Sequence, residues 1–74
     1  MKGITETRAI IDDRSNRLGM KFSDAAAIAG MAPKTLREKC ADPGRFSIYE
    51  LKHLFDGLKL TDMQKDAIIK EALQ

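Results

Sequence analysis

The chain has 74 residues, a hydrophobic fraction of 43% and a formal net charge of +2. This length allows one small domain over 1–74, and the ordinary apolar content argues against disorder. The single cysteine, Cys40, excludes an internal disulfide and is typical of the reducing cytoplasm. No apolar run approaches the roughly 18 residues of a membrane span, and no apolar leader is present at the start. We therefore expect a cytoplasmic protein that does not bind a membrane.

Positive charge is concentrated in the first two-thirds of the chain. Residues 1–21 carry five Lys or Arg against three Asp or Glu, and residues 33–45 carry four against two. Residues 46–74 carry four against five. This asymmetry favours an electropositive face, although scattered solubilising charge would produce the same totals.

The apolar spacing is helical throughout, and it predicts an all-α fold: a compact bundle of about five short helices. Ile4, Ile11 and Leu18 recur every seven residues and predict one stripe of a first helix over about 5–18. Gly19 then ends this helix.

A glycine separates the second and third predicted helices. A short Ala-rich helix over about 23–29 has Ser23 as its expected N-cap and ends at Gly30, which can adopt the positive φ of a tight turn. Pro33 suits the first turn of a third helix, which stops before Pro43.

The third helix has an apolar and a polar side. Met31 and Leu36 are spaced to fill the angle between it and the second helix. The polar side, where a DNA major groove would lie, carries Lys34, Thr35, Arg37 and Glu38.

Two further helices begin at capping signals. Ser47 and Glu50 have the spacing of a capping box before a helix over about 48–58, and Thr61 and Gln64 repeat this spacing before a fifth helix. The residues expected to face inward are Ile48, Leu51, Leu54, Phe55 and Leu58 in the fourth helix, and Met63, Ala67 and Leu73 in the fifth.

The helix, glycine turn and helix over 23–40 resemble those of the lambda-repressor-like helix-turn-helix domains of phage repressors, Cro proteins and their bacterial relatives. The resemblance covers about residues 5–72. It rests on the order and spacing of Leu18-Gly19-Met20, then Ala26, Gly30, Met31, Thr35 and Leu36, then the loop Asp42-Pro43-Gly44-Arg45-Phe46. It implies a sequence-specific DNA-binding transcriptional regulator of the phage or prophage Cro or repressor type.

The resemblance also implies roles for individual residues on double-stranded DNA. Ser23, Arg37 and Arg45 would bind the sugar–phosphate backbone. Glu38 would read a base, or would pair with Lys34 one helical turn away. The residues placed to read base edges are Pro33, Lys34, Thr35 and Glu38.

Members of this family usually bind paired half-sites, so the resemblance implies a homodimer. The fifth helix carries more apolar residues than one core-facing stripe can hide. The surplus, expected at the dimer interface, is Ile68, Ile69 and Ala72. The alternative is that this helix is wedged between the first and fourth helices with all its apolar residues covered.

No catalytic constellation is present in the sequence. His53 and Cys40 are single residues without carboxylates at ligand spacing, and there is no phosphate-binding loop. We therefore expect neither an enzyme nor a metal or cofactor site. The alternative function is a protein-binding helix-turn-helix module, such as an antirepressor or adaptor, and binding of nucleic acid without sequence preference also stays open.

Overall fold

The computed structural model describes residues 4–74, and this part of the chain is helical without strands. The elements are α1 (Glu6–Arg17), α2 (Phe22–Ala29), α3 (Pro33–Ala41), the short 3-10 helix η1 (Pro43–Arg45), α4 (Ile48–Gly57) and α5 (Asp62–Ala72). The prediction of an all-α fold with five helices is confirmed. Lys2, one of the basic residues counted above, lies outside the described residues. Over 4–74, each helix is too short or too polar to cross a bilayer.

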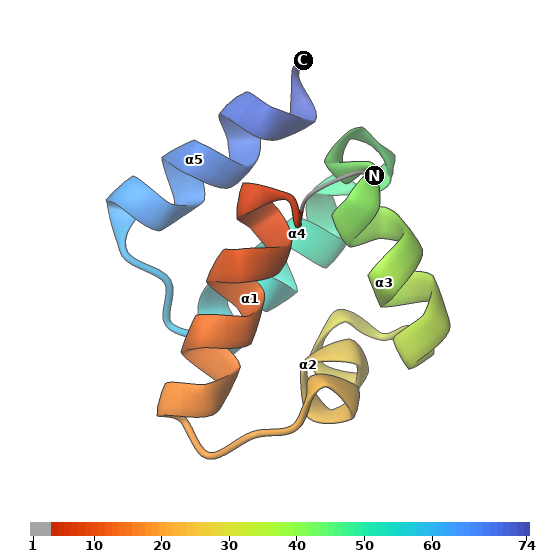
Figure 1. The fold of residues 1–74 in the computed structure, drawn as a ribbon, viewed down its shortest axis with the longest axis vertical. Coiled ribbons are helices and arrows are strands. Elements are labelled where there is room, and N and C mark those ends of the chain that lie inside the picture. The colour runs from red at the N-terminus through yellow and green to blue at the C-terminus, as the bar shows by residue number, and fades with distance from the viewer. Residues whose placement is uncertain (1–3) are drawn as a thin grey trace.

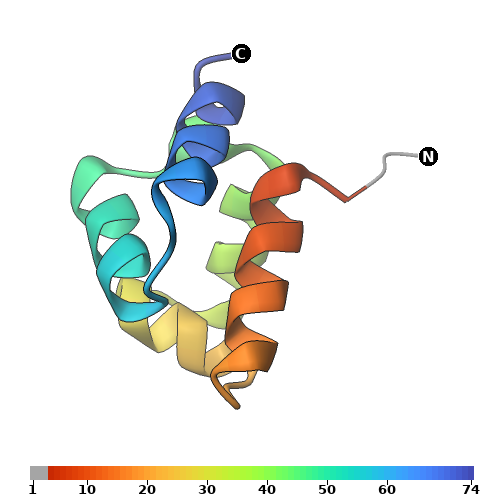
Figure 2. The same cartoon turned by 90° about the vertical axis from the view of Figure 1, so that its left-hand side faces the viewer.

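The helices surround one core. Figure 1 shows α1 between α5 on one side and α3 on the other, and Figure 2 shows α4 on the opposite side of the molecule from α1. Helix α2 contacts α1, α3 and α4. Such close neighbours are possible because Ala25, Ala26 and Ala29 are the buried residues of α2. Gly57 of α4 is equally necessary, since a Cβ there would lie 2.5 Å from Cγ2 of Ile28.

The predicted helix starts are mostly confirmed. The backbone N–H of Glu50 donates to Ser47 Oγ at 3.1 Å, and that of Gln64 donates to Thr61 Oγ1 at 3.2 Å. Gly30 has the predicted positive φ, at 76°. The start of α2 differs from the prediction.

Ser23 is not the N-cap of α2. The cap is Lys21, and Ser23 is the exposed second residue of the helix. Asp24 supplies the reciprocal contact of a capping box, because its Oδ2 accepts a hydrogen bond from the backbone N–H of Lys21 at 2.9 Å. The backbone N–H of the N-cap residue has no partner within the helix, and an acceptor in the third helical position satisfies it.

The stripe predicted for α1 is wrong at both ends. Ile11 is fully buried, but Ile4 and Leu18 are exposed because they lie outside the helix. The buried residues at helical spacing are instead Thr7, Ile11 and Ser15. Thr7 lies between Ile4 and Ile11 on the predicted stripe, whereas Ser15, which is also polar, could not be detected by a search for apolar periodicity.

Two helices of the C-terminal half also face differently from the prediction. Ile48 is 82% exposed and Leu73 is 81% exposed, and Met63 is exposed as well. Ile68, expected at a dimer interface, is only 1% exposed and belongs to the core. The inward side of α5 is centred on Ile68, and the half-buried Glu71, about one turn further on, binds α1.

Glu71 joins the last turn of α5 to the first turn of α1. Its carboxylate accepts hydrogen bonds from Thr7 Oγ1 at 2.6 Å, from Thr7 N at 2.8 Å and from Glu6 N at 3.0 Å. The first N–H groups of a helix have no partner within the helix and carry partial positive charge, so a carboxylate is a favourable partner. Glu71 is 65 positions from Glu6 and 64 positions from Thr7, so these hydrogen bonds join the two ends of the fold.

Candidate nucleic-acid interface

Helix α3 has one packed side and one open side. Leu36 and Cys40, one turn apart, are buried against the rest of the fold. On the other side Lys34, Arg37 and Glu38 are exposed and Thr35 is half-buried. Pro33, also exposed, is the first residue of the helix, where the missing N–H of proline costs no hydrogen bond.

Arg45 lies beside this open side, although it belongs to η1. A hollow of about 310 Å³ is lined by Thr35, Glu38, Lys39 and Arg45. Arg45 itself is exposed. The structure therefore brings together three residues that the sequence analysis had assigned to DNA contact from two separate segments.

Lys39 fixes the side of α3 that faces α4. Its Nζ donates to both carboxylate oxygens of Glu50, at 2.7 and 2.8 Å, and both side chains are 22% exposed. The hydrogen bond from Lys39 and that from the backbone N–H of Ser47 hold the pKa of Glu50 below its usual value. This bridge ties the recognition-helix candidate to the start of α4, next to the loop that carries Arg45.

The intramolecular pair considered for Lys34 and Glu38 is not formed. The ion pairs among residues 4–74 are Arg8–Asp12, Arg17–Asp13, Lys39–Glu50 and Lys70–Asp66. Glu38 instead borders the hollow together with two cationic side chains, Lys39 and Arg45.

Ser23 lies apart from the hollow, in the first turn of α2 next to Phe22. Phe22 is close to α3, because the guanidinium carbon of Arg37 lies 6.0 Å from the centre of its ring. The open side of α3 is thus flanked by the start of α2 near Arg37 and by η1 near Thr35.

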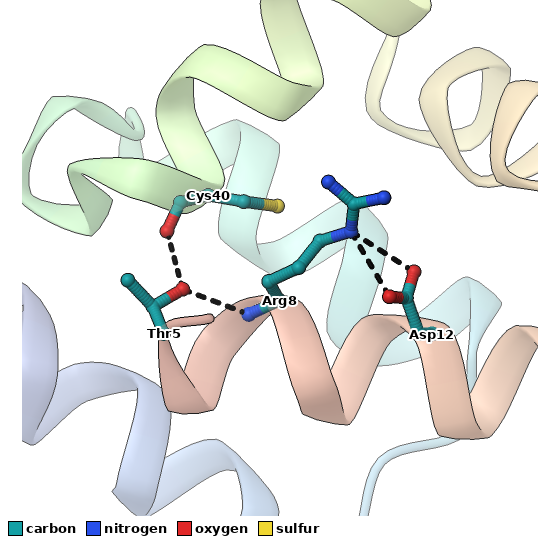
Figure 3. Close-up of polar contacts among 4 residues, drawn as sticks. All are labelled: Thr5, Arg8, Asp12 and Cys40. Atoms are coloured by element: carbon teal, nitrogen blue, oxygen red, sulfur yellow. Dashed lines mark hydrogen bonds and ion pairs between the residues drawn. The ribbon is translucent and has the colours of Figure 1, made fainter. Parts of the chain in front are cut away.

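A contact between the start of α1 and the end of α3 has no signal in the apolar spacing of the sequence. Thr5 Oγ1 donates to the backbone oxygen of Cys40 at 2.6 Å and accepts from the N–H of Arg8 at 3.1 Å (Figure 3). Burial raises the pKa of the Cys40 thiol to about 12, so the thiol stays protonated near neutral pH. Cys40 therefore serves as a core residue, and its carbonyl group anchors α3 to the start of α1.

A second surface feature lies between α4 and α5. An apolar groove of about 450 Å³ is lined by Leu51, Phe55, Ile69, Ala72 and their neighbours Ile48, Lys52, Asp56, Lys65 and Leu73. Ile69 is 42% exposed, and Ala72 is half-buried. Of the three residues expected at a dimer interface, the groove includes Ile69 and Ala72 but excludes the buried Ile68.

Comparison of this chain with protein-family models, with curated proteins and with solved structures finds no match.

Proposed function

We propose that the protein is a helix-turn-helix transcriptional regulator that binds double-stranded DNA in a sequence-specific manner, with α3 as its recognition helix. The observation that carries this proposal is the open side of α3, where Lys34, Arg37 and Glu38 are exposed and Arg45 joins them from η1. A helix of this kind fits the major groove, where Lys34, Thr35 and Glu38 would meet base edges.

Contacts to the sugar–phosphate backbone of the DNA would lie on both sides of α3. Arg45 and the N–H groups at the start of α4 would bind the sugar–phosphate backbone on one side, and Arg37 with the first turn of α2 at Ser23 would bind it on the other. Pro33 at the start of α3 would lie near the bases. This arrangement uses short, rigid elements that the bridge from Lys39 to Glu50 holds in place.

Selection of binding sites from random duplex DNA tests the proposal. We expect an enriched sequence and an affinity that falls linearly with salt on logarithmic axes, with a slope of about 0.9 per phosphate neutralised. A variant combining Lys34→Ala, Thr35→Ala and Arg37→Ala should keep its helical circular dichroism, because these side chains point away from the core. It should bind the selected duplex about tenfold more weakly or worse, since one base contact is worth about 1–3 kcal/mol.

The control for this variant is Lys70→Ala, which removes a lysine whose ion pair with Asp66 lies on α5. It should bind the selected duplex as the parent protein does. Absence of any enriched sequence, or full affinity in the triple variant, would contradict the assignment of α3.

The groove between α4 and α5 supports a second part of the proposal, namely that the protein binds DNA as a homodimer. Ile48 and Leu73, which line the groove, are exposed, so a copy related by a two-fold axis would offer apolar side chains to fill it. The charged residues that line the groove are Lys52, Lys65 and Asp56. Because the patch carries both signs of charge, lysines of one copy could face the aspartate of the other across a two-fold axis. A second copy is therefore the occupant that we propose.

Sedimentation equilibrium tests the dimer. We expect Ile69→Asp to remain folded and to sediment as a monomer, because a charge would enter the centre of the apolar patch. Asp66→Asn, a change on the same helix but outside the groove, should sediment as the parent protein does. A parent protein that is a monomer both free and on a palindromic site would contradict dimerisation.

The alternative function, a protein-binding module such as an antirepressor or adaptor, draws support from the same exposed apolar residues. Tyr49, at the start of α4, is exposed beside Ile48 and would add an aromatic contact for such a partner. Binding through a mostly apolar interface should change little with salt, whereas DNA binding should weaken steeply.

A further inference from the structure

Phe22 lies against the guanidinium groups of two arginines from different helices. The guanidinium carbon of Arg8, on α1, is 4.3 Å from the centre of the Phe22 ring, and that of Arg37, on α3, is 6.0 Å away. The face of an aromatic ring attracts cations at such distances. Because both guanidinium carbons are measured from the same ring centre, the distance between them is at most the sum of these two values. The ring thus holds two like charges near each other, although they repel.

Arg8 is also held from a second direction. Its Nε lies 3.1 and 3.0 Å from the two carboxylate oxygens of Asp12. Figure 3 shows that only Nε, and neither terminal nitrogen, is joined to Asp12, and within the described residues no hydrogen bond from the two terminal nitrogens is formed. The side chain remains 29% exposed. Arg8 is thus fixed at one edge while the other edge, with its N–H donors, is available.

We propose that Phe22 is a positioning residue which orients Arg8 and Arg37 toward the phosphate backbone of bound DNA, and that Arg8 is a phosphate-binding residue. The inference rests on the proposed function, because it assigns Arg8 and Phe22 to the flank of the recognition helix that Arg37 occupies. A guanidinium whose orientation is set before binding loses less conformational freedom when it meets a phosphate. The ring of Phe22 supplies that orientation for both arginines without donating to the phosphate itself.

Arg17 provides a matched control for Arg8. Both residues are on α1 and both pair through Nε with an aspartate four positions away. Nine positions separate them, which is two and a half helical turns, so they project from opposite sides of α1. Arg8→Gln and Arg17→Gln remove the same charge and the same kind of ion pair, but only Arg8→Gln removes the group stacked on Phe22.

The first measurement is the affinity of these variants for the selected duplex as a function of salt. Arg8→Gln should weaken binding and reduce the slope of log affinity against log salt by about 0.9, the value for one lost phosphate contact. Arg17→Gln should leave both quantities unchanged. If Arg8→Gln matches Arg17→Gln in affinity and slope, Arg8 does not bind phosphate and the inference is overturned, while the proposed function stands.

The second measurement is a double-mutant cycle on Phe22. Phe22→Leu, which keeps an apolar side chain but loses the aromatic face, should weaken binding about threefold to tenfold, and Phe22→Tyr should restore it. In a protein that already carries Arg8→Gln and Arg37→Gln, Phe22→Leu should have almost no further effect. Equal losses in both backgrounds would show that Phe22 acts through the fold alone and would overturn its positioning role.

The free protein offers a readout that needs no DNA. The ring of Phe22 should shift the side-chain proton resonances of Arg8 and Arg37 upfield in the nuclear magnetic resonance spectrum, and Phe22→Leu should remove both shifts. Absence of these shifts in the parent protein would overturn the stacked arrangement. Absence of any duplex binding by the parent protein, with the shifts present, would instead overturn the proposed function and with it the role of Arg8.

Discussion

Ile68→Asp is expected to unfold the protein, whereas Ile69→Asp is expected to leave it folded. Ile68 is 1% exposed at the centre of the packed side of α5, and Ile69, the next residue, is 42% exposed. Truncation of a buried isoleucine costs about 2–5 kcal/mol, and burial of an unpaired carboxylate adds several more. A domain of 74 residues has a free energy of unfolding of roughly 4–11 kcal/mol. The cost of the Ile68→Asp substitution is therefore as large as this free energy or larger.

Circular dichroism and urea unfolding measure this difference directly. Ile69→Asp should keep the helical signal and change the free energy of unfolding by less than about 1 kcal/mol. Ile68→Ala, a milder variant without a buried charge, should lose about 2–5 kcal/mol. A cooperative unfolding transition of Ile68→Asp close to that of the parent protein would show that α5 is rotated from the orientation described.

Glu71→Ala should destabilise the protein by about 2 kcal/mol near neutral pH. Three hydrogen bonds end on this carboxylate, and two of their donors, Glu6 N and Thr7 N, are backbone groups of the first turn of α1. Loss of a helix cap costs typically about 1 kcal/mol, and hydrogen bonds to a charged group are stronger than neutral ones. Asp66→Asn, which removes only an exposed ion pair on the same helix, should cost less than about 1 kcal/mol.

The effect of Glu71 should depend on pH. Burial by itself raises the pKa of Glu71, but the hydrogen bonds from Thr7 and from Glu6 N outweigh it and place the pKa below its usual value. A lowered pKa in the folded state means that the stabilisation is complete above the unfolded value of about 4.3 and is lost as the pH falls through the folded value. Urea unfolding of the parent protein and Glu71→Ala should therefore differ at pH 7 and converge in acid. If the difference in free energy of unfolding were the same at pH 7 and in acid, the stabilisation would not come from the ionised carboxylate of Glu71.

The sequence by itself determined where most of the helices begin and end, with the start of α2 as the exception. Ser47 with Glu50, Thr61 with Gln64, Gly30 and Pro33 act on backbone groups within one turn of themselves, so their effect is readable without the rest of the fold. The polar side of α3 was readable for a related reason. Leu36 and Cys40, one turn apart, set the buried side of a short helix, and Lys34 and Glu38 then lie opposite.

Only the tertiary structure decided which apolar side chains are buried and which polar ones join helices. Ile68 is covered and Ile69 is not, in a helix whose Glu71 binds N–H groups of α1, and one of these partners lies 65 positions away along the chain. Likewise, Arg8 meets Phe22 only because α1 and α2 pack together. Burial and hydrogen bonding of this kind depend on neighbours that are distant in sequence, and apolar periodicity within one helix carries no information about them.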